Sequence, residues 1–144
     1  MKRNQGFTLI ELMIVVSIIA IIAAIAIPSL LNARKAGNEA SAISAMRTLT
    51  TVNEQYRTRF GTAAIGYSDD LTNLEAAGYI DSVLGTGSKS GYVFTYASPD
   101  RNTWTCSATP ETDGTTGDRG FFVDETGVIR AADGVADATS DPIE

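Results

Sequence analysis

The 144-residue chain contains no histidine and a single cysteine, Cys106. These absences exclude a Ser-His or Cys-His catalytic pair, a histidine-ligated metal and a disulfide within the chain. Basic residues are also scarce in the C-terminal part, because residues 61–144 carry four of them against fourteen acidic ones, a net charge of −10. Neutralising nucleic-acid phosphates requires clustered Lys and Arg. The composition therefore disfavours most enzyme classes and nucleic-acid binding.

The chain does contain one long apolar run, which lies near its N-terminus. Residues 7–27 read FTLIELMIVVSIIAIIAAIAI, and Glu11 is the only charged residue among them. About 21 helical residues, at about 1.5 Å each, span the roughly 30 Å hydrocarbon core of a bilayer. Lys2 and Arg3 precede the run. The positive-inside tendency therefore predicts a single-pass membrane helix with a cytoplasmic N-terminus and with everything after Pro28 on the outer side.

Helix-forming residues continue beyond Pro28 to about residue 60. Residues at spacings of three and four form one helical stripe whose apolar character only Asn53 interrupts: Ala42, Ala45, Met46, Leu49, Val52, Asn53, Tyr56 and Phe60. A helix over residues 7–60 would be on the order of 80 Å long, too long for a compact domain of this size to enclose. Its first half must therefore be covered by lipid or by other copies. Pro28 cannot donate a backbone hydrogen bond, so we predict a bend there.

After residue 60 the pattern changes from helix to strand. A short helix is predicted over Leu71 to Ala77, capped by Asp69 or Asp70 and closed by Gly78. Segments rich in aromatic and β-branched residues predict four strands over 92–98, 103–108, 119–124 and 127–132, joined by turn-forming residues. The fold class is therefore predicted as α+β, with the stripe of the long helix covering one face of a small antiparallel sheet. The polar, acidic ending after residue 132 is predicted to be loosely ordered.

The apolar run has two ordinary explanations, and each leaves something unexplained. It is longer than the apolar region of a usual secretory signal peptide, and no A-x-A cleavage site precedes a polar mature start. A plain signal anchor fits the length but leaves Glu11 unaccounted for. A carboxylate near the bilayer centre costs about 2.5 kcal/mol or more, and such a residue usually marks a function or a partner.

The segment KRNQGFTLIELMIVVSIIAIIAAIAIPSLLNARK resembles the start of the type IV pilin and type II secretion pseudopilin family. The resemblance rests on a short basic leader ending at Gly6, the following Phe7, the FTLIEL run with Glu11, and Pro28 at the far end of the apolar stretch. It implies that an inner-membrane prepilin peptidase cuts after Gly6 and methylates the new amino group of Phe7. The mature chain would then lose the leader charges of Lys2 and Arg3.

Cleavage after Gly6 would place a new ammonium group on Phe7, four residues before Glu11. In an apolar bundle of helices each buried Glu11 needs a cation, either the ammonium of its own chain or that of a neighbour. The family resemblance favours the neighbour, and such a pair would fix the axial register of each subunit. The alternative is that Glu11 is a carboxylate near the membrane interface, favoured there by the helix dipole.

Other candidate residues have simpler explanations. Cys106 lies in a predicted strand beside Trp104 and is interpreted as a small core residue. Many type IV pilins close a C-terminal loop with two cysteines, which this chain cannot do. Four acidic residues in or near two turns offer oxygen ligands for Ca²⁺, although turn chemistry explains them more simply: Asp113, Asp118, Asp124 and Glu125.

Pro28 either ends the membrane segment or lets the helix loosen when subunits enter a filament.

The chain is thus divided into a leader (1–6), a membrane and filament-core helix (7–27), an amphipathic continuation (28–60) and a head (61–144). The favoured function is a non-enzymatic structural subunit of a type IV pilus or pilus-like filament. Its expected partners are copies of itself or related pilins, the prepilin peptidase and inner-membrane assembly proteins, and it would pass from the bacterial inner membrane into a filament. The alternatives are a pseudopilin of the type II secretion system and a membrane-anchored periplasmic binding domain.

Overall fold

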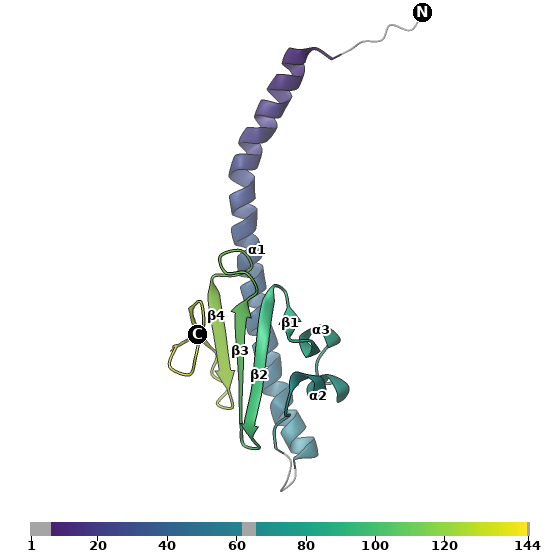
Figure 1. Ribbon diagram of the computed structural model, residues 1–144, viewed down its shortest axis with the longest axis vertical. Coiled ribbons are helices and arrows are strands. Elements are labelled where there is room, and N and C mark those ends of the chain that lie inside the picture. The colour runs from purple at the N-terminus through teal and green to yellow at the C-terminus, as the bar shows by residue number, and fades with distance from the viewer. Residues whose placement is uncertain (1–6, 62–65, 144) are drawn as a thin grey trace, which may run out of the picture. The chain divides into compact units, whose positions relative to one another are not determined.

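The structure is a computed structural model that describes residues 7–61 and 66–143 (Figure 1). The helices are α1 (Leu9–Phe60), α2 (Leu71–Ala76) and α3 (Ser82–Gly85), and the strands are β1 (Ser88–Lys89), β2 (Tyr92–Asp100), β3 (Thr103–Pro110), β4 (Arg119–Asp124), β5 (Arg130–Asp133) and β6 (Asp141–Pro142). Internal contacts divide the chain into two units, residues 1–33 and residues 34–144. They are called here the N-terminal unit and the C-terminal unit.

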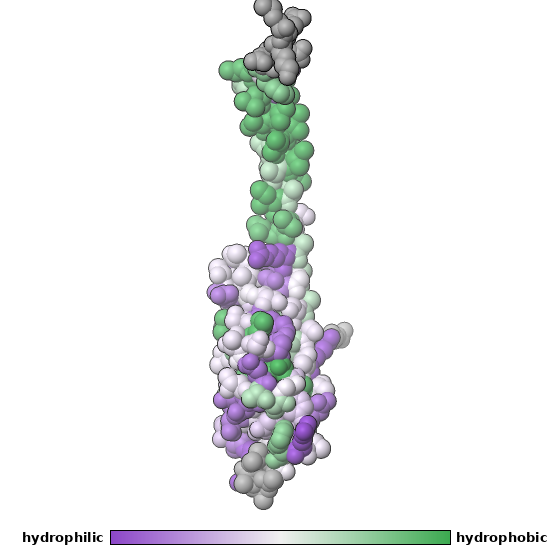
Figure 2. Space-filling view, turned by 90° about the vertical axis from the view of Figure 1, so that its right-hand side faces the viewer, coloured by the Kyte–Doolittle hydropathy of each residue, from purple (hydrophilic) through white to green (hydrophobic). Residues whose placement is uncertain are grey.

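The described part of the N-terminal unit is the first half of α1, and it has no apolar core of its own. Every side chain from Phe7 to Ala33 is exposed except the half-buried Ala23. The surface of this segment is accordingly hydrophobic (Figure 2). By length and composition α1 can cross a membrane, since its most apolar 18 residues have a mean hydropathy of 2.9. Such an apolar surface requires a cover of lipid or protein.

The C-terminal unit pairs a helix layer with a sheet layer. Its six strands are all antiparallel and follow one another in chain order across the sheet. Two sets of residues lie opposite one another on neighbouring strands. The first is Phe94, Ala108, Phe121 and Ala131 on β2 to β5, and the second is Tyr96, Cys106 and Val123 on β2 to β4. Both sets point to the same face, which the second half of α1 covers (Figure 1). The predicted α+β fold, a long helix followed by a small antiparallel sheet, is confirmed.

The core lies between α1 and the sheet. The helix contributes the predicted stripe, of which Ala42, Ala45, Met46, Leu49, Val52 and Asn53 are buried. Tyr56 is half-buried, whereas Phe60 at the end of the helix is exposed. The strands contribute the largest side chains, among them Tyr92, Trp104 and Phe121. The burial of alternate residues in β2 and β3 explains why these strands could be recognised from their aromatic spacing.

The predicted short helix is present as α2, and its ends are set by the expected residues. Asp70 caps the N-terminus, accepting a 2.7 Å hydrogen bond from the Asn73 backbone N–H. At the other end, Gly78 adopts a positive φ of 78°. The Gly78 N–H donates to the Glu75 carbonyl, and the Tyr79 N–H donates to the Leu74 carbonyl, which together form a Schellman motif.

The structure corrects two sequence predictions in the C-terminal unit. The predicted strand over 127–132 begins later, because Gly127 has a positive φ and closes a turn onto the Asp124 carbonyl. The ending after residue 132, predicted to be loosely ordered, is held in place. Its Ala136 is only 3% exposed, and β6 pairs with β5 at the edge of the sheet. The elements α3, β1 and β6 were not predicted.

One polar residue, Asn53, is fully buried in the helix stripe. Its Oδ1 atom lies 3.0 Å from the hydroxyl of Tyr96, which also lies 2.9 Å from the Ser68 carbonyl oxygen. The hydroxyl can donate its single hydrogen to either acceptor. Burial raises the pKa of Tyr96, so this hydroxyl stays protonated at neutral pH. A polar residue at this position of the stripe is therefore explained by a partner on β2.

Replacing Tyr96 with phenylalanine is expected to destabilise the protein by about 1–3 kcal/mol, because two buried acceptors then lose their shared donor. Tyr56→Phe is the matched control, since no hydrogen bond from the Tyr56 hydroxyl is found among the described residues. The control should change stability by less than about 0.5 kcal/mol. Thermal unfolding of the full-length chain in detergent, followed by circular dichroism, measures both. Equal stability of the two variants would contradict the assignment.

Candidate functional site

The first turn of α1 contains a reciprocal hydrogen-bond pair between Thr8 and Glu11. The Thr8 backbone N–H donates to Glu11 Oε2 over 2.9 Å, and the Thr8 hydroxyl donates to the same oxygen over 2.6 Å. The Glu11 backbone N–H lies 3.3 Å from Thr8 Oγ1. A Ser or Thr at the N-cap that exchanges contacts with a Glu three residues later is a capping box. Glu11 therefore helps to start the helix.

Thr8 was not predicted from the sequence, although the signal was present. The pattern T-x-x-E directly before an apolar helical run is the usual mark of a capping box. Capping does not exclude the predicted role of Glu11 in assembly, because a carboxylate offers about four lone-pair sites and the capping contacts use only one of its oxygens. The other oxygen, Oε1, remains available to a cation from outside the chain.

The remaining predicted site residues of the N-terminal unit are placed as follows. Phe7 is 89% exposed and lies just before the helix. Pro28 lies inside α1, which continues through it to Phe60, so whether the helix bends or loosens there remains a prediction. The leader residues Lys2, Arg3 and Gly6 lie outside the described residues.

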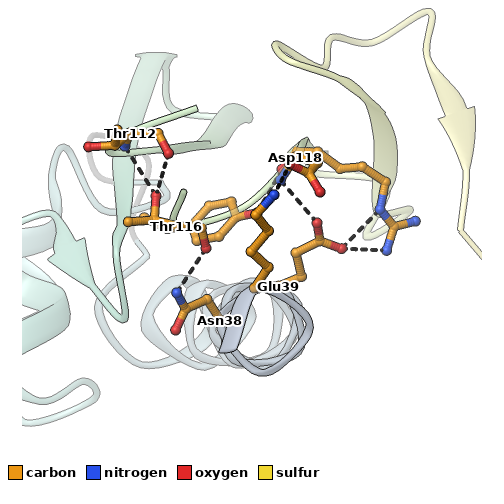
Figure 3. Close-up of polar contacts among 8 residues, drawn as sticks. Asn38, Glu39, Thr112, Thr116 and Asp118 are labelled. Carbon is orange, nitrogen blue, oxygen red and sulfur yellow. Dashed lines mark hydrogen bonds and ion pairs between the residues drawn. The ribbon is translucent and has the colours of Figure 1, made fainter. Parts of the chain in front are cut away.

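In the C-terminal unit, three residues of α1 hold the loop that joins β3 to β4 (Figure 3). Lys35 forms a 2.9 Å ion pair with Asp118, and Glu39 forms a 2.8 Å ion pair with Arg119. Between them, Asn38 donates a 2.8 Å hydrogen bond to the Thr116 carbonyl oxygen. Exposed ion pairs contribute about 0–1 kcal/mol each, so these contacts position the loop more than they stabilise the fold.

The acidic residues that could offer oxygen ligands to Ca²⁺ do not share a common set of contacts. Asp118 pairs with Lys35, while Asp124 accepts a 3.0 Å hydrogen bond from the Thr126 backbone N–H. Asp113 forms an isolated bridge with Gly117, and Glu125 is exposed in a turn. Within residues 7–61 and 66–143, no group of three or more Asp, Glu, Cys or His side chains is arranged to hold a metal ion.

Cys106 is fully buried on β3. Burial raises the pKa of its thiol to about 12, so the reactive thiolate is scarce at neutral pH. The side chain faces the core beside Val123 of β4. These surroundings are those of a packing residue.

Comparison with known proteins identifies the motif at the N-terminus. Residues 1–27 match the family model described as "Prokaryotic N-terminal methylation motif". The chain is also 37% identical over 57 residues to the "Type IV wide pilus major component PilA4" of Thermus thermophilus. That match covers 40% of this chain and 44% of the relative, so the chain spans less than half of the relative's length. No solved structure matches the chain.

The resemblance to type IV pilins inferred from the sequence is confirmed for the N-terminal segment. The prepilin-type methylation motif ends at residue 27, where the apolar run also ends. The chain therefore carries this methylation motif and is similar over part of its length to a type IV pilus component. Each of the two matches extends over a minority of the chain, so the function of the whole protein is a matter for proposal.

Proposed function

We propose that the protein is a structural subunit of a type IV pilus or pilus-like filament. The observation that carries the proposal is a prokaryotic methylation motif that includes the start of a helix whose residues 9–33 expose an apolar surface. The subunit is made as a precursor in the bacterial inner membrane, with residues 1–6 in the cytoplasm and the C-terminal unit on the outer side. It then leaves the bilayer when its apolar helix packs against the helices of other copies, and it has no enzymatic role.

Processing of the precursor involves residues at the start of the motif. Lys2 and Arg3 keep the leader in the cytoplasm through their charge. A prepilin peptidase cuts after Gly6, a residue without a side chain that lets the peptidase approach the backbone closely, and the same enzyme methylates the amino group of Phe7. Exposure of Phe7, 89% in the free chain, supports access to this end of the helix.

In the filament, Glu11 pairs with the ammonium group of Phe7 on a neighbouring copy. A subunit shifted along the filament axis would leave both charges in an apolar environment without a partner, which is costly. The capping contacts with Thr8 hold the Glu11 side chain at the start of the helix, so Oε1 is presented in a defined place. Pro28 supplies a position at which α1 can loosen during the transfer from bilayer to filament.

Intact-mass analysis of the filament or membrane fraction tests the proposal. The expected mass is that of a chain that begins at Phe7 and carries one added methyl group. A Gly6→Val variant, in which a branched side chain occupies the cleavage position, should keep residues 1–6 and remain in the membrane. Recovery of the functional wild-type protein with Met1 to Gly6 still attached would instead favour a membrane-anchored periplasmic binding domain and overturn the proposal.

The similarity to a protein named as a pilus component favours a pilus over a type II secretion pseudopilus. The two assemblies use subunits of the same general design, so the deciding observation lies outside the chain. Neighbouring genes for pilus retraction or for secretion, together with motility and secretion assays of a deletion strain, separate them. Loss of motility with normal secretion is the result expected here.

A further inference from the structure

Two depressions of about 390 and 490 Å³ lie along α1 beside the segment that carries α2 and α3, and Tyr79 lines both of them. The pair of depressions is called here the Tyr79 groove. Ala45, Thr48 and Ile80 line the first, while Thr58 and Arg59 line the second. Figure 2 looks onto this side of the C-terminal unit, where hydrophobic patches lie among polar ones.

Arg59 brings to the groove a positive charge that forms no ion pair with a described carboxylate. The other charged residues that line it have partners of opposite charge nearby. Lys89 pairs with Asp81 at 2.7 Å, and Glu54 accepts a 2.6 Å hydrogen bond from the Tyr67 hydroxyl, to which the Arg57 guanidinium donates over 2.9 Å. Arg59 has no carboxylate within ion-pair distance among the described residues, and its guanidinium lies 5.4 Å from the centre of the Phe60 ring. An apolar group flanked by carboxylates would therefore suit the groove.

The loop between β5 and β6 presents a group of this kind. Val135 is 73% exposed, more than any other large apolar side chain described in the C-terminal unit. It lies between Asp133 and Asp137, both exposed. These three residues are called here the valine knob.

The valine knob is held in place by its own loop. Ala136 beside it is 3% exposed, and Gly134, with a φ of 81°, donates a hydrogen bond to the Asp118 carbonyl oxygen. The Asp137 carboxylate accepts hydrogen bonds from the Thr139 backbone N–H and hydroxyl, at 2.8 and 2.7 Å. Binding to a group held in this way costs little ordering entropy.

The groove and the valine knob lie at opposite edges of the same sheet. The first depression is lined by Leu84 of α3 and Lys89 of β1, the first strand of the sheet, while the knob lies in the loop between β5 and β6, the last two strands. One chain therefore cannot place its own knob in its own groove. A contact between two different patches of identical chains is heterologous, and it continues from copy to copy into an open helical assembly when the ring does not close.

We propose that the valine knob of one copy docks into the Tyr79 groove of the next copy, with the Asp133 and Asp137 carboxylates beside Arg59. This contact between heads rests on the proposed filament function and would add to the packing of the N-terminal helices. Each subunit would then offer its valine knob at one edge of the sheet and its groove at the other. The contact also assigns a role to an exposed valine and to an arginine that has no ion-pair partner among the described residues.

Cysteine crosslinking in cells tests the contact with the full-length chain. Val135→Cys is combined with Thr48→Cys in the first depression or with Thr58→Cys in the second, and sheared filaments are oxidised with copper–phenanthroline. Each copy then carries one knob thiol and one groove thiol, so the expected product is a ladder of dimers, trimers and longer chains. The native Cys106 is buried and should not contribute. Val93→Cys replaces the knob cysteine in the control, because Val93 is 39% exposed on the outer face of the sheet.

The outcomes separate this contact from the filament function. Filaments that contain the processed chain but give no ladder with either pairing would overturn the docking and leave the proposed function standing. A ladder of equal strength from the Val93 control would also overturn it. Absence of filaments from the unmodified chain would count against both proposals.

Charge exchange provides an independent test of the same contact. Arg59→Asp alone, or Asp133→Arg alone, should each lower the filament yield severalfold, and the combined variant should restore it, while Asp137 is left intact because its carboxylate holds the knob loop. Arg47→Asp is the control, because Arg47 is exposed on α1 but does not line the groove. Failure of the combination to restore filaments that both partial variants had lost would contradict the pairing.

Discussion

Replacing Glu11 with alanine is expected to leave the chain in the membrane but to lower its incorporation into filaments more than about tenfold. Breaking a buried ion pair by removing one partner costs about 3–5 kcal/mol, because the remaining charge is left unpaired. In the proposed filament, the remaining charge is the ammonium group of Phe7 on a neighbouring copy. Membrane insertion should not suffer, since removing a carboxylate from the apolar run makes the helix easier to insert.

The capping box requires a second substitution at the same position. Alanine removes both the charge and the hydrogen bonds to Thr8, which lie at 2.9 and 2.6 Å in the structure. Glu11→Gln removes the charge but keeps an oxygen acceptor, and glutamine also forms capping boxes. If the charge governs assembly, Glu11→Gln should be almost as defective as Glu11→Ala. Near-normal filaments from Glu11→Gln would show that helix capping is the main role of this residue.

Thr8→Ala completes the comparison, because it weakens the cap and keeps the carboxylate. Loss of an N-cap side chain costs about 0.5–2 kcal/mol of helix stability, so filaments should be fewer but still present. The three variants are compared by immunoblotting sheared filaments against the membrane fraction. Intact masses must show that each variant begins at Phe7, which separates an assembly defect from failed processing.

The parts of the fold that the sequence predicts are those with a repeating pattern. The second half of α1 was recognised because its buried residues recur every three or four positions, from Ala42 to Val52. β2 and β3 were recognised because large side chains alternate along them, with Tyr92 and Trp104 turned to the core. In these segments local pattern and tertiary burial agree, so the pattern alone is sufficient.

The missed elements are too short to show a period. β1 and β6 contain two residues each, and their strand geometry comes from pairing with a longer neighbour. The acidic ending of the chain is a similar case, since its composition suggests a loose tail. It is ordered instead by Ala136, which is buried, and by Asp137, whose carboxylate closes a turn. Such contacts form only in the folded sheet, so the local sequence gives little indication of them.

The sequence also predicts only part of the candidate site, because some of its contacts depend on where the helix begins. Glu11 was singled out because a charge in an apolar run is costly, which is a property of composition. Its contact with Thr8 depends on where the helix begins, and the helix was predicted to begin at Phe7 rather than at Leu9. A start at Leu9 makes Thr8 the N-cap and reveals the pair. The groove and the valine knob could not be predicted, because they join residues that are far apart in the chain.

The second large effect is expected at Trp104. Its ring is fully buried, stacked on Tyr96 with 5.8 Å between ring centres, and in edge contact with Tyr67 at 6.3 Å. Trp104→Ala should lower the free energy of unfolding by about 3–5 kcal/mol, because it removes a large apolar surface and leaves a cavity. For a domain of marginal stability this is a large share of the total. Thermal unfolding of the full-length chain in detergent, followed by circular dichroism, measures the loss.

Trp104→Phe separates packing from polarity at this position. The buried Nε1–H of Trp104 has no hydrogen-bond acceptor among the described residues, so the phenyl ring removes an unsatisfied donor together with some volume. The two effects oppose each other, because the lost volume destabilises and the removed donor stabilises. Trp104→Phe should therefore cost well under half of what Trp104→Ala costs. A loss as large as that of the alanine variant would mean that Nε1–H donates to an acceptor, such as a buried water, that stabilises the head.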